Sequence, residues 1–270
     1  MPPPPRSSIR RRRSAGGDGP RGRALTLLEV ERVSKAFGGV RAVSEVSFAV
    51  EDGELIGVMG PNGSGKTTLF NLITGALEPD AGAIRLHDRD ITGFPPHRVC
   101  AEGIARTFQS ARPFAGLSAL DNVLVGRFYG RARGDPRAGV RDAERLLTLV
   151  GLEGKAHRLP AQLTLIDLKR LELARALATS PRLLLLDELM AGLNPAETES
   201  AMALIRRLRG EGVTLLMVEH IVWALMDLSR RIIVLSAGEK IADGPPDAVA
   251  ADPTVIDAYL GGAGGSARRA

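Results

Sequence analysis

The residues from Gly60 to Thr67, GPNGSGKT, have the types and the spacing of a loop that binds phosphate groups. The glycines at 60, 63 and 65 let the backbone turn so that successive N–H groups point at phosphate oxygens, and the helix that follows adds its positive end. In such a loop Lys66 reaches the outer phosphates and the Thr67 hydroxyl binds Mg²⁺. The predicted nucleotide-binding residues are Gly60, Pro61, Asn62, Gly63, Ser64, Gly65, Lys66, Thr67 and Thr68.

Polar side chains follow two apolar runs further along the chain. LLLLDE ends in Asp187 and Glu188, and LLMVEH ends in His220. Because ligands collect at the carboxyl ends of parallel strands, we predict that these residues meet the phosphate loop. Asp187 is expected to bind Mg²⁺ through water and Glu188 to act as general base on the attacking water. His220 is expected to contact the γ-phosphate, and Gln109, in RTFQ, offers an amide for Mg²⁺ or for that water. The alternatives are a solvated acid pair and a structural histidine.

Short apolar runs that alternate with helical patterns are expected to position these side chains. ELIGVMG leads directly into the glycine-rich loop, and helical spacing follows, so strand, turn and helix come in the required order. RLLLLDE and VTLLMVEH are typical of strands buried on both faces. This alternation predicts an α/β domain with a largely parallel sheet. Residues 95 to 175 lack core-strand runs, and we interpret them as an inserted helical subdomain.

The charge of the chain lies mainly in its first segment. The 270 residues are 44% hydrophobic and 25% charged, which is enough apolar material for one sizeable core or two small ones. Seven arginines against the single acid Asp18 give residues 1–24 a charge of +6, which leaves −1 of the total +5 for the rest. The body is therefore not basic, and no nucleic-acid partner is expected.

Residues 1–24 consist largely of Pro, Gly, Ser and Arg, and we expect them to form a disordered leader. No apolar run follows the arginines as a signal peptide would require, although the four-arginine run could touch acidic lipid headgroups. No stretch approaches the ~18 consecutive apolar residues of a spanning helix, so a membrane role would come through a partner. The single cysteine, Cys100, fits a reducing compartment and is expected to serve packing.

Five motifs in order, GPNGSGKT, RTFQ, LARALATSPRLLLLDE, AGLNP and VEH, resemble the nucleotide-binding subunit of an ATP-binding cassette (ABC) transporter. The resemblance implies an α/β fold, the ABC-type P-loop NTPase domain, with a mostly parallel core sheet, an antiparallel β subdomain and an inserted helical subdomain. It covers residues 25–262 and leaves 263–270 as a flexible tail. VSKAFGGVRAVSEVSF, GIARTFQSARPF, DELMAGLNPAE and ADPTVIDAYLG are similar to cassettes of branched-chain amino-acid uptake. Cassettes for urea uptake and lipopolysaccharide export look similar too.

The resemblance also implies roles and partners. Phe37 matches the aromatic residue that stacks on adenine, with a packing phenylalanine as the alternative. Asn194 falls in a loop that crosses a dimer interface, where the family usually has aspartate, and Leu189 stands where the family usually has proline. Residues 110–135 are expected to contact transmembrane permease subunits, which work with a substrate-binding protein. The expected location is the cytoplasmic face of the cell membrane, as a peripheral subunit.

The family motif Leu-Ser-Gly-Gly-Gln, which closes over the nucleotide of the opposite subunit, is altered here. The five positions are occupied by Leu163, Thr164, Leu165, Ile166 and Asp167. Thr164 keeps a hydroxyl, whereas bulky side chains replace both glycines and Asp167 adds a negative charge. We interpret this as a sign of a heterodimer, in which the site on this chain's phosphate loop hydrolyses ATP and the site completed by residues 163–167 turns over slowly. The alternative is that the segment tolerates these residues and both sites work.

These inferences together predict an ATPase subunit that powers a membrane transporter, with ATP and Mg²⁺ as its ligands and branched-chain or other hydrophobic amino acids as the imported cargo. Two alternatives belong to other classes. A non-transport cassette acting on DNA or ribosomes would need a second cassette, a coiled coil or a basic body. A regulatory ATP-binding module without turnover is favoured by the altered motif and opposed by Glu188.

Overall fold

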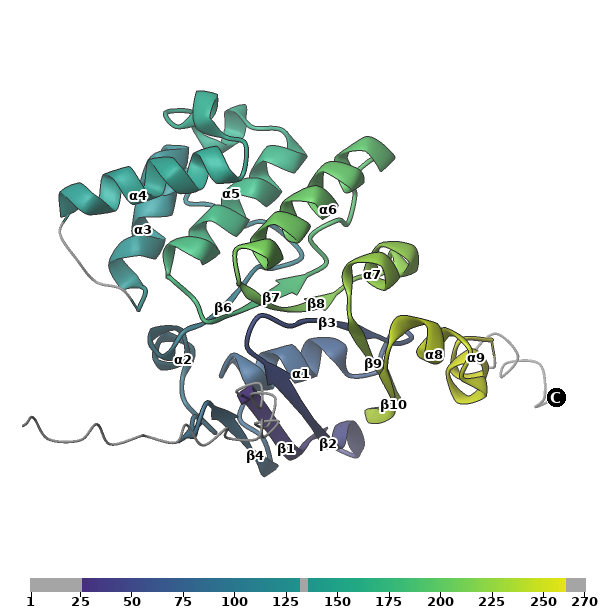
Figure 1. Cartoon of the computed structure of the whole chain (residues 1–270). Coiled ribbons are helices and arrows are strands. Elements are labelled where there is room, and N and C mark those ends of the chain that lie inside the picture. Colours follow the sequence, from purple (N-terminus) through teal and green to yellow (C-terminus); the bar gives the residue numbers. More distant parts are fainter. Residues whose placement is uncertain (1–25, 132–135, 261–270) are drawn as a thin grey trace, which may run out of the picture.

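The computed structural model describes residues 26–131 and 136–260, which form two β-sheets and the helices packed on them (Figure 1). The strands are β1 (Thr26–Phe37), β2 (Val40–Glu51), β3 (Leu55–Met59), β4 (Ala81–Leu86), β5 (Arg89–Asp90), β6 (Ile104–Arg106), β7 (Leu183–Asp187), β8 (Thr214–Val218), β9 (Arg231–Ser236) and β10 (Glu239–Gly244). The α-helices are α1 (Lys66–Ile73), α2 (Pro96–Glu102), α3 (Ala119–Tyr129), α4 (Pro136–Leu149), α5 (Leu165–Ala178), α6 (Pro195–Gly210), α7 (Val222–Leu228), α8 (Pro246–Ala250) and α9 (Pro253–Leu260). Two short 3₁₀ helices are η1 (Glu153–Lys155) and η2 (Pro160–Gln162).

The larger sheet carries the glycine-rich loop. Its strands lie in the order β10-β9-β3-β8-β7-β6, and every neighbouring pair except β10–β9 is parallel. β3 lies between β9 and β8, so the loop that follows β3 emerges beside the carboxyl ends of its neighbours. The prediction of a mostly parallel core sheet is confirmed.

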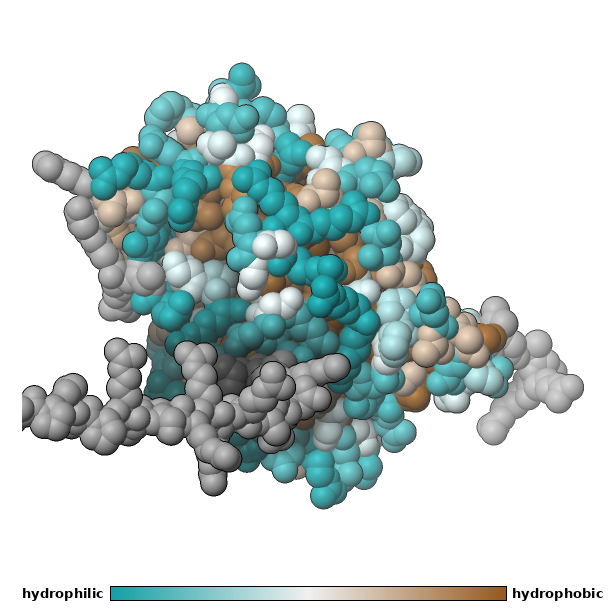
Figure 2. All heavy atoms as spheres, in the orientation of Figure 1, coloured by the Kyte–Doolittle hydropathy of each residue, from teal (hydrophilic) through white to brown (hydrophobic). Residues whose placement is uncertain are grey.

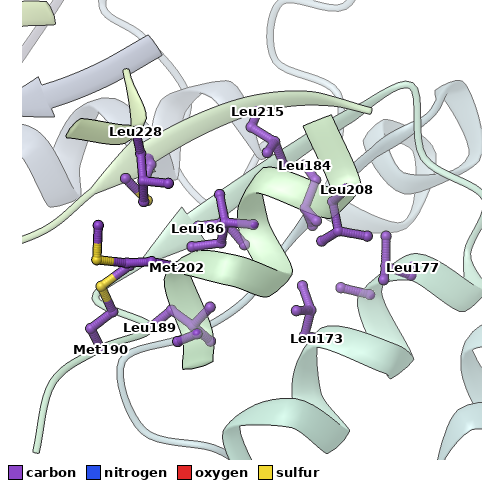
Figure 3. Packing of buried hydrophobic residues seen from close by; sticks show 14 of the residues in the cluster. Leu173, Leu177, Leu184, Leu186, Leu189, Met190, Met202, Leu208, Leu215 and Leu228 are labelled. Carbon is purple, nitrogen blue, oxygen red and sulfur yellow. The ribbon is translucent and has the colours of Figure 1, made fainter. Parts of the chain in front are cut away.

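Strands β3, β7 and β8 are buried along their whole length, which accounts for their uninterrupted apolar runs. Successive side chains of a strand point to opposite faces, so the two faces enter different cores. Leu184 and Leu186 pack beneath α5 and α6, with Leu173 of α5 in the same cluster (Figure 3). Leu183 and Leu185 join the second cluster around α1. Each leucine of β7 therefore stabilises one of two layers.

The smaller sheet is antiparallel, with strands in the order β2-β1-β4-β5. Helix α1 lies between the two sheets in Figure 1, and Phe70 and Ile73 of α1 share a core with Val30 of β1 and Leu185 of β7. This packing fixes the start of α1, and with it the glycine-rich loop, against both sheets. The predicted antiparallel subdomain is confirmed.

Helices α3, α4 and α5 contact one another and stand apart from the smaller sheet (Figure 1). One part of the expected range for the helical subdomain, 95–175, is wrong, because β6 lies inside it and pairs with β7 in the core sheet. A strand of three residues that ends in arginine has too short an apolar run to be read from its pattern. The expected leader, 1–24, and tail, 263–270, lie outside the described residues.

The surface of the described region is largely hydrophilic in the view of Figure 2, with hydrophobic residues showing between the helices of the upper half. Among the described helices, none is both long enough and apolar enough to cross a bilayer.

Candidate active site

The glycine-rich loop is shaped by close contacts with neighbouring backbone. Gly60 has a φ of 152°, and a Cβ there would lie 2.1 Å from the carbonyl oxygen of Leu235 in β9. Gly65, the N-cap of α1, has a φ of 104°, and a Cβ would lie 2.3 Å from the carbonyl oxygen of Ala42. A side chain at either position would push the loop off its supports, so the sequence must place glycine there.

Lys66 is held inside the loop. Its Nζ donates to the carbonyl oxygens of Gly60 at 2.7 Å and Pro61 at 2.9 Å. Burial lowers the pKa of this ammonium from its ordinary value, and the carboxylates of Glu188 and Asp187 oppose that shift. The loop and Lys66 line a cavity of about 190 Å³, to which Glu188 and His220 also contribute. The structure thus brings together the predicted phosphate-binding and hydrolytic residues.

Glu188 lies at the centre of a small polar cluster. Its Oε2 accepts a hydrogen bond from Gln109 Nε2 at 2.6 Å, and its Oε1 lies 2.7 Å from His220 Nε2. The backbone of Glu188 has a φ of 51°, a left-handed conformation that is uncommon for a residue with a side chain and occurs often at functional sites. The three side chains predicted from separate motifs are therefore in direct contact, and a carboxylate flanked in this way is suited to accept a proton from water.

Asp187 lies at the end of β7, where its carboxylate is paired with an arginine that the sequence did not single out. Arg106 Nη2 donates to Asp187 Oδ2 at 2.5 Å, and Arg106 Nη1 donates to Asn71 of α1 at 2.6 Å. Both charged side chains of the pair are less than a tenth exposed. The only sequence clue to a role for Arg106 was its position directly before Thr107, Phe108 and Gln109. The pairing of β6 with β7 brings it to Asp187, and this pairing cannot be seen in the sequence.

The donors at this edge fit Mg²⁺. Thr67 offers a hydroxyl, Gln109 an amide oxygen and Asp187 a carboxylate, which are the hard oxygen ligands that Mg²⁺ prefers. Within residues 26–131 and 136–260, no cluster of three or more His, Cys, Asp or Glu side chains forms a closed metal cage. Thr67 and Gln109 are exposed, whereas Asp187 is buried and paired with Arg106, so a cation here would be bound mainly by nucleotide phosphates and water.

Phe37 ends β1 and is 48% exposed, with Lys35 Nζ 5.9 Å from the ring centroid. The ring is therefore open on the surface, as an adenine-stacking residue must be, and its role stays a prediction. Leu189, by contrast, is buried in the core beneath α6 (Figure 3).

The altered segment 163–167 forms the start of α5 and holds itself together. Thr164 is the N-cap, and its N–H donates to Asp167 Oδ2 at 3.2 Å, while Asp167 N donates back to Thr164 Oγ1 at 3.4 Å. Lys155 Nζ donates to the same Asp167 oxygen at 2.6 Å. Although burial acts in the opposite direction, these bonds from Lys155 and Thr164 lower the pKa of Asp167. The negative charge that Asp167 was expected to add is therefore already paired, and the side chain is 2% exposed.

Leu165 and Ile166 lie on the first turn of α5, with Leu165 47% exposed. Leu165 also reaches the AGLNP loop, since a Cβ on Gly192 would lie 3.3 Å from Leu165 Cδ2. In that loop Asn194 caps α6, accepting from Glu197 N at 3.0 Å. Residues 163–167 and the AGLNP loop, the two segments predicted to face the partner cassette, are therefore neighbours.

An apolar groove lies on the other side of Arg106. It has a volume of about 470 Å³ and is lined by residues of α2, β6, α3 and α5. Glu172 of α5 lies at its wall, accepting from Phe108 N at 2.6 Å with Oε1, while Oε2 is buried without a partner among the described residues. Burial raises the pKa of Glu172 to about 7, and burial does the same for Glu219, which precedes His220. Neither carboxyl was a sequence candidate.

The raised pKa of Glu172 predicts a pH dependence of stability. Between about pH 4.5 and 7 the folded chain keeps a proton on Glu172 that the unfolded chain has released, so this carboxyl makes the folded state less stable as the pH rises. Glu172→Gln should remove that contribution. In urea unfolding at about pH 5 and about pH 8, the variant should gain stability relative to the parent at the higher pH. The exposed control Glu199→Gln should show no such gain, and an equal response of both variants would contradict the assignment.

Comparison with known proteins gives consistent matches over most of the chain. Residues 43–191 match the family described as ABC transporter, and residues 239–264 match the family described as branched-chain amino acid ATP-binding cassette transporter. The high-affinity branched-chain amino acid transport ATP-binding protein BraF of Pseudomonas aeruginosa is 41% identical over 249 residues, which cover 87% of this chain and 98% of BraF.

Two solved structures are similar as well. The ADP conformation of MJ1267, an ATP-binding cassette of an ABC transporter, has a TM-score of 0.80 and 31% identity, covering 88% of this chain and 99% of that one. A dimeric post-hydrolysis state of the ATP-binding cassette MJ0796, bound to ADP and Pi, has a TM-score of 0.73 and 26% identity, covering 82% and 99%.

Proposed function

This chain belongs to the ABC transporter family of ATP-binding cassettes, and from that membership we propose that it hydrolyses ATP to drive import of branched-chain or other hydrophobic amino acids. The observation that carries the proposal is the cavity formed by the glycine-rich loop, Glu188 and His220. The cargo rests on the match of residues 239–264 and on the named function of BraF.

In the proposed mechanism the loop N–H groups and Lys66 hold the β and γ phosphates. Glu188 accepts the proton of the attacking water. Gln109 and His220 orient the Glu188 carboxylate, and His220 also contacts the γ-phosphate. Thr67, Gln109 and Asp187 would hold Mg²⁺, which offsets the negative charge of the phosphates when it is bound. Phe37 stacks on the adenine ring. Lys66 begins α1 and Glu188 follows β7, and the packing of both elements in the cores supports a site that is positioned before the nucleotide arrives.

The working unit we propose is a dimer of cassettes attached to transmembrane permease subunits, at the cytoplasmic face of the membrane. The dimeric structure of MJ0796 supports the first contact. The apolar groove beside Glu172 supports the second, because an exposed apolar hollow of this size is suited to a partner helix. A substrate-binding protein would act through the permeases.

The start of α5 supports a partner that differs from this chain. The side chains of Leu165 and Ile166 stand where the family has glycines, and they obstruct close approach of backbone N–H groups to a phosphate. A second cassette with an intact Leu-Ser-Gly-Gly-Gln motif would close the site on this chain's phosphate loop. The heterodimer would then have one fast and one slow site.

Steady-state ATP hydrolysis tests the proposal. The chain is purified and assayed alone and mixed with a cassette that carries the intact motif, and Glu188→Gln is the blank in each case. Activity that appears only in the mixture and is lost with Glu188→Gln would support one working site on this chain. Equal activity of the chain alone would show that the altered segment functions and would overturn the asymmetric dimer. ATP binding without phosphate release in every pairing would instead show a regulatory module.

A further inference from the structure

Lys169 is a buried cation that neither the motifs nor the proposed mechanism uses. It lies on α5, one turn after Leu165, and is 4% exposed. Its Nζ donates to the carbonyl oxygen of Gln109 at 2.7 Å and to the carbonyl oxygen of Glu188 at 3.2 Å. A buried ammonium is costly unless it is hydrogen-bonded, and here both acceptors are backbone atoms of site residues.

The two contacts of Lys169 hold the backbone on which the Gln109 and Glu188 side chains are placed. The side chains of Gln109 and Glu188 bond each other at 2.6 Å, although Gln109 follows β6 and Glu188 follows β7. Glu188 also has the left-handed φ of 51°, which persists only where surrounding contacts hold it. Its N–H is fixed by the carbonyl of Val218 at 2.9 Å, and Lys169 holds its carbonyl.

The ammonium also acts through its charge on two buried carboxyls. These are Glu172 of α5 and Glu219, which directly follows β8. Glu219 in turn accepts from Met190 N at 3.0 Å, two residues after Glu188. Lys169 therefore joins two backbone carbonyls of the site and also acts through its charge on two buried carboxyls.

We propose that Lys169 is a positioning residue, which ties helix α5 to the backbones of Gln109 and Glu188 and so sets the place of the proton-accepting carboxylate. The proposal rests on the proposed function for its effect on turnover. Since α5 begins with the segment expected to face the partner's nucleotide, a shift of α5 would reach the backbones of both Gln109 and Glu188 through the Lys169 side chain. Lys169 would thus link the two sites of a dimer.

The test compares Lys169→Met with Arg170→Met, a control that removes one positive charge from the same helix. Arg170 bonds Ser200 of α6 and does not touch the cluster. We expect Lys169→Met to lower kcat about tenfold to a hundredfold, as small misplacements of reacting groups do, while ATP affinity stays within about twofold. Lys169→Arg, which keeps the charge and the donors, should recover much of the loss. The control should keep its kcat.

Hydrogen exchange gives a readout that does not depend on turnover. In Lys169→Met, peptides covering residues 104–112 and 184–191 should exchange faster than in the parent, and Arg170→Met should leave both unchanged. Unchanged exchange and unchanged kcat in Lys169→Met would overturn the proposal. If Lys169→Met does not fold, Lys169→Gln, which can donate to one carbonyl, is compared with Lys169→Arg, and equal exchange in these two variants would overturn it as well. If the parent shows no ATPase activity even when mixed with a cassette that carries the intact motif, but its exchange still responds to Lys169→Met, the proposed function would be contradicted and the positioning role would stand.

Discussion

Replacing Glu188 by glutamine should lower the rate of ATP hydrolysis about 10²- to 10⁴-fold, the range that a positioned general base contributes. Glutamine has the same shape and can still accept from Gln109, but it cannot take a proton from water. The contacts of the Glu188 side chain with Gln109 and His220 predict that the glutamine side chain stays in the same place. ATP affinity should therefore be retained, and the variant should hold ATP in a stable complex.

The measurement is phosphate release at saturating ATP beside a fluorescent-nucleotide binding curve. Glu199→Gln is the matched control, since Glu199 is an exposed residue of α6 that takes no part in capping the helix. Retention of more than about a tenth of the parent rate by Glu188→Gln would assign the proton-accepting role to another group.

Lys66→Met should produce the second large effect, a loss of ATP binding. The ammonium already lies in the loop, on the carbonyls of Gly60 and Pro61, so it needs little reordering to meet a phosphate. Hydrogen bonds to charged groups contribute roughly 1.5 to 3 kcal/mol, so we expect the Kd for ATP to rise about tenfold to a hundredfold. Methionine keeps most of the length and removes the charge.

Binding is measured by titration with a fluorescent ATP analogue, and thermal unfolding checks that the loop has not collapsed. Lys240→Met, which removes a lysine that is paired with Asp243 and does not line the cavity of the loop, is the control for charge. Glu188→Gln and Lys66→Met together separate catalysis from binding. Glu188→Gln should bind ATP without hydrolysing it, and Lys66→Met should fail to bind ATP. A Lys66→Met chain with parental affinity would show that the backbone N–H groups alone hold the phosphates.

Much of the core fold could be predicted because burial on both faces leaves a plain signal in the sequence. β3, β7 and β8 each appear as an uninterrupted apolar run, and the polar residue after such a run lies at the ligand edge of a parallel sheet. From that rule the sequence predicted that Glu188 and His220 lie beside the glycine-rich loop. β6 was missed because three residues carry no periodicity.

The supporting residues could not be predicted because their roles arise from tertiary contacts. Nothing in the letters around Arg106 or Lys169 shows that one pairs with Asp187 and the other with two backbone carbonyls. For Asp167 the residue was noted in the sequence, but its contacts were not predicted. The capping contacts with Thr164 and the ion pair with Lys155 decide where its carboxylate points.

The central place of β3 has a consequence for synthesis on the ribosome. β3 ends at Met59, whereas its neighbours β8 and β9 begin at Thr214 and Arg231, so roughly 155 residues must be made before its first neighbour exists. At a translation rate of about 5–20 residues per second, the apolar strand waits about 8 to 30 seconds with both edges unpaired. Unpaired strand edges attract other chains. The nascent protein is therefore expected to depend on chaperones during this interval, and the glycine-rich loop can take its final shape only near the end of translation.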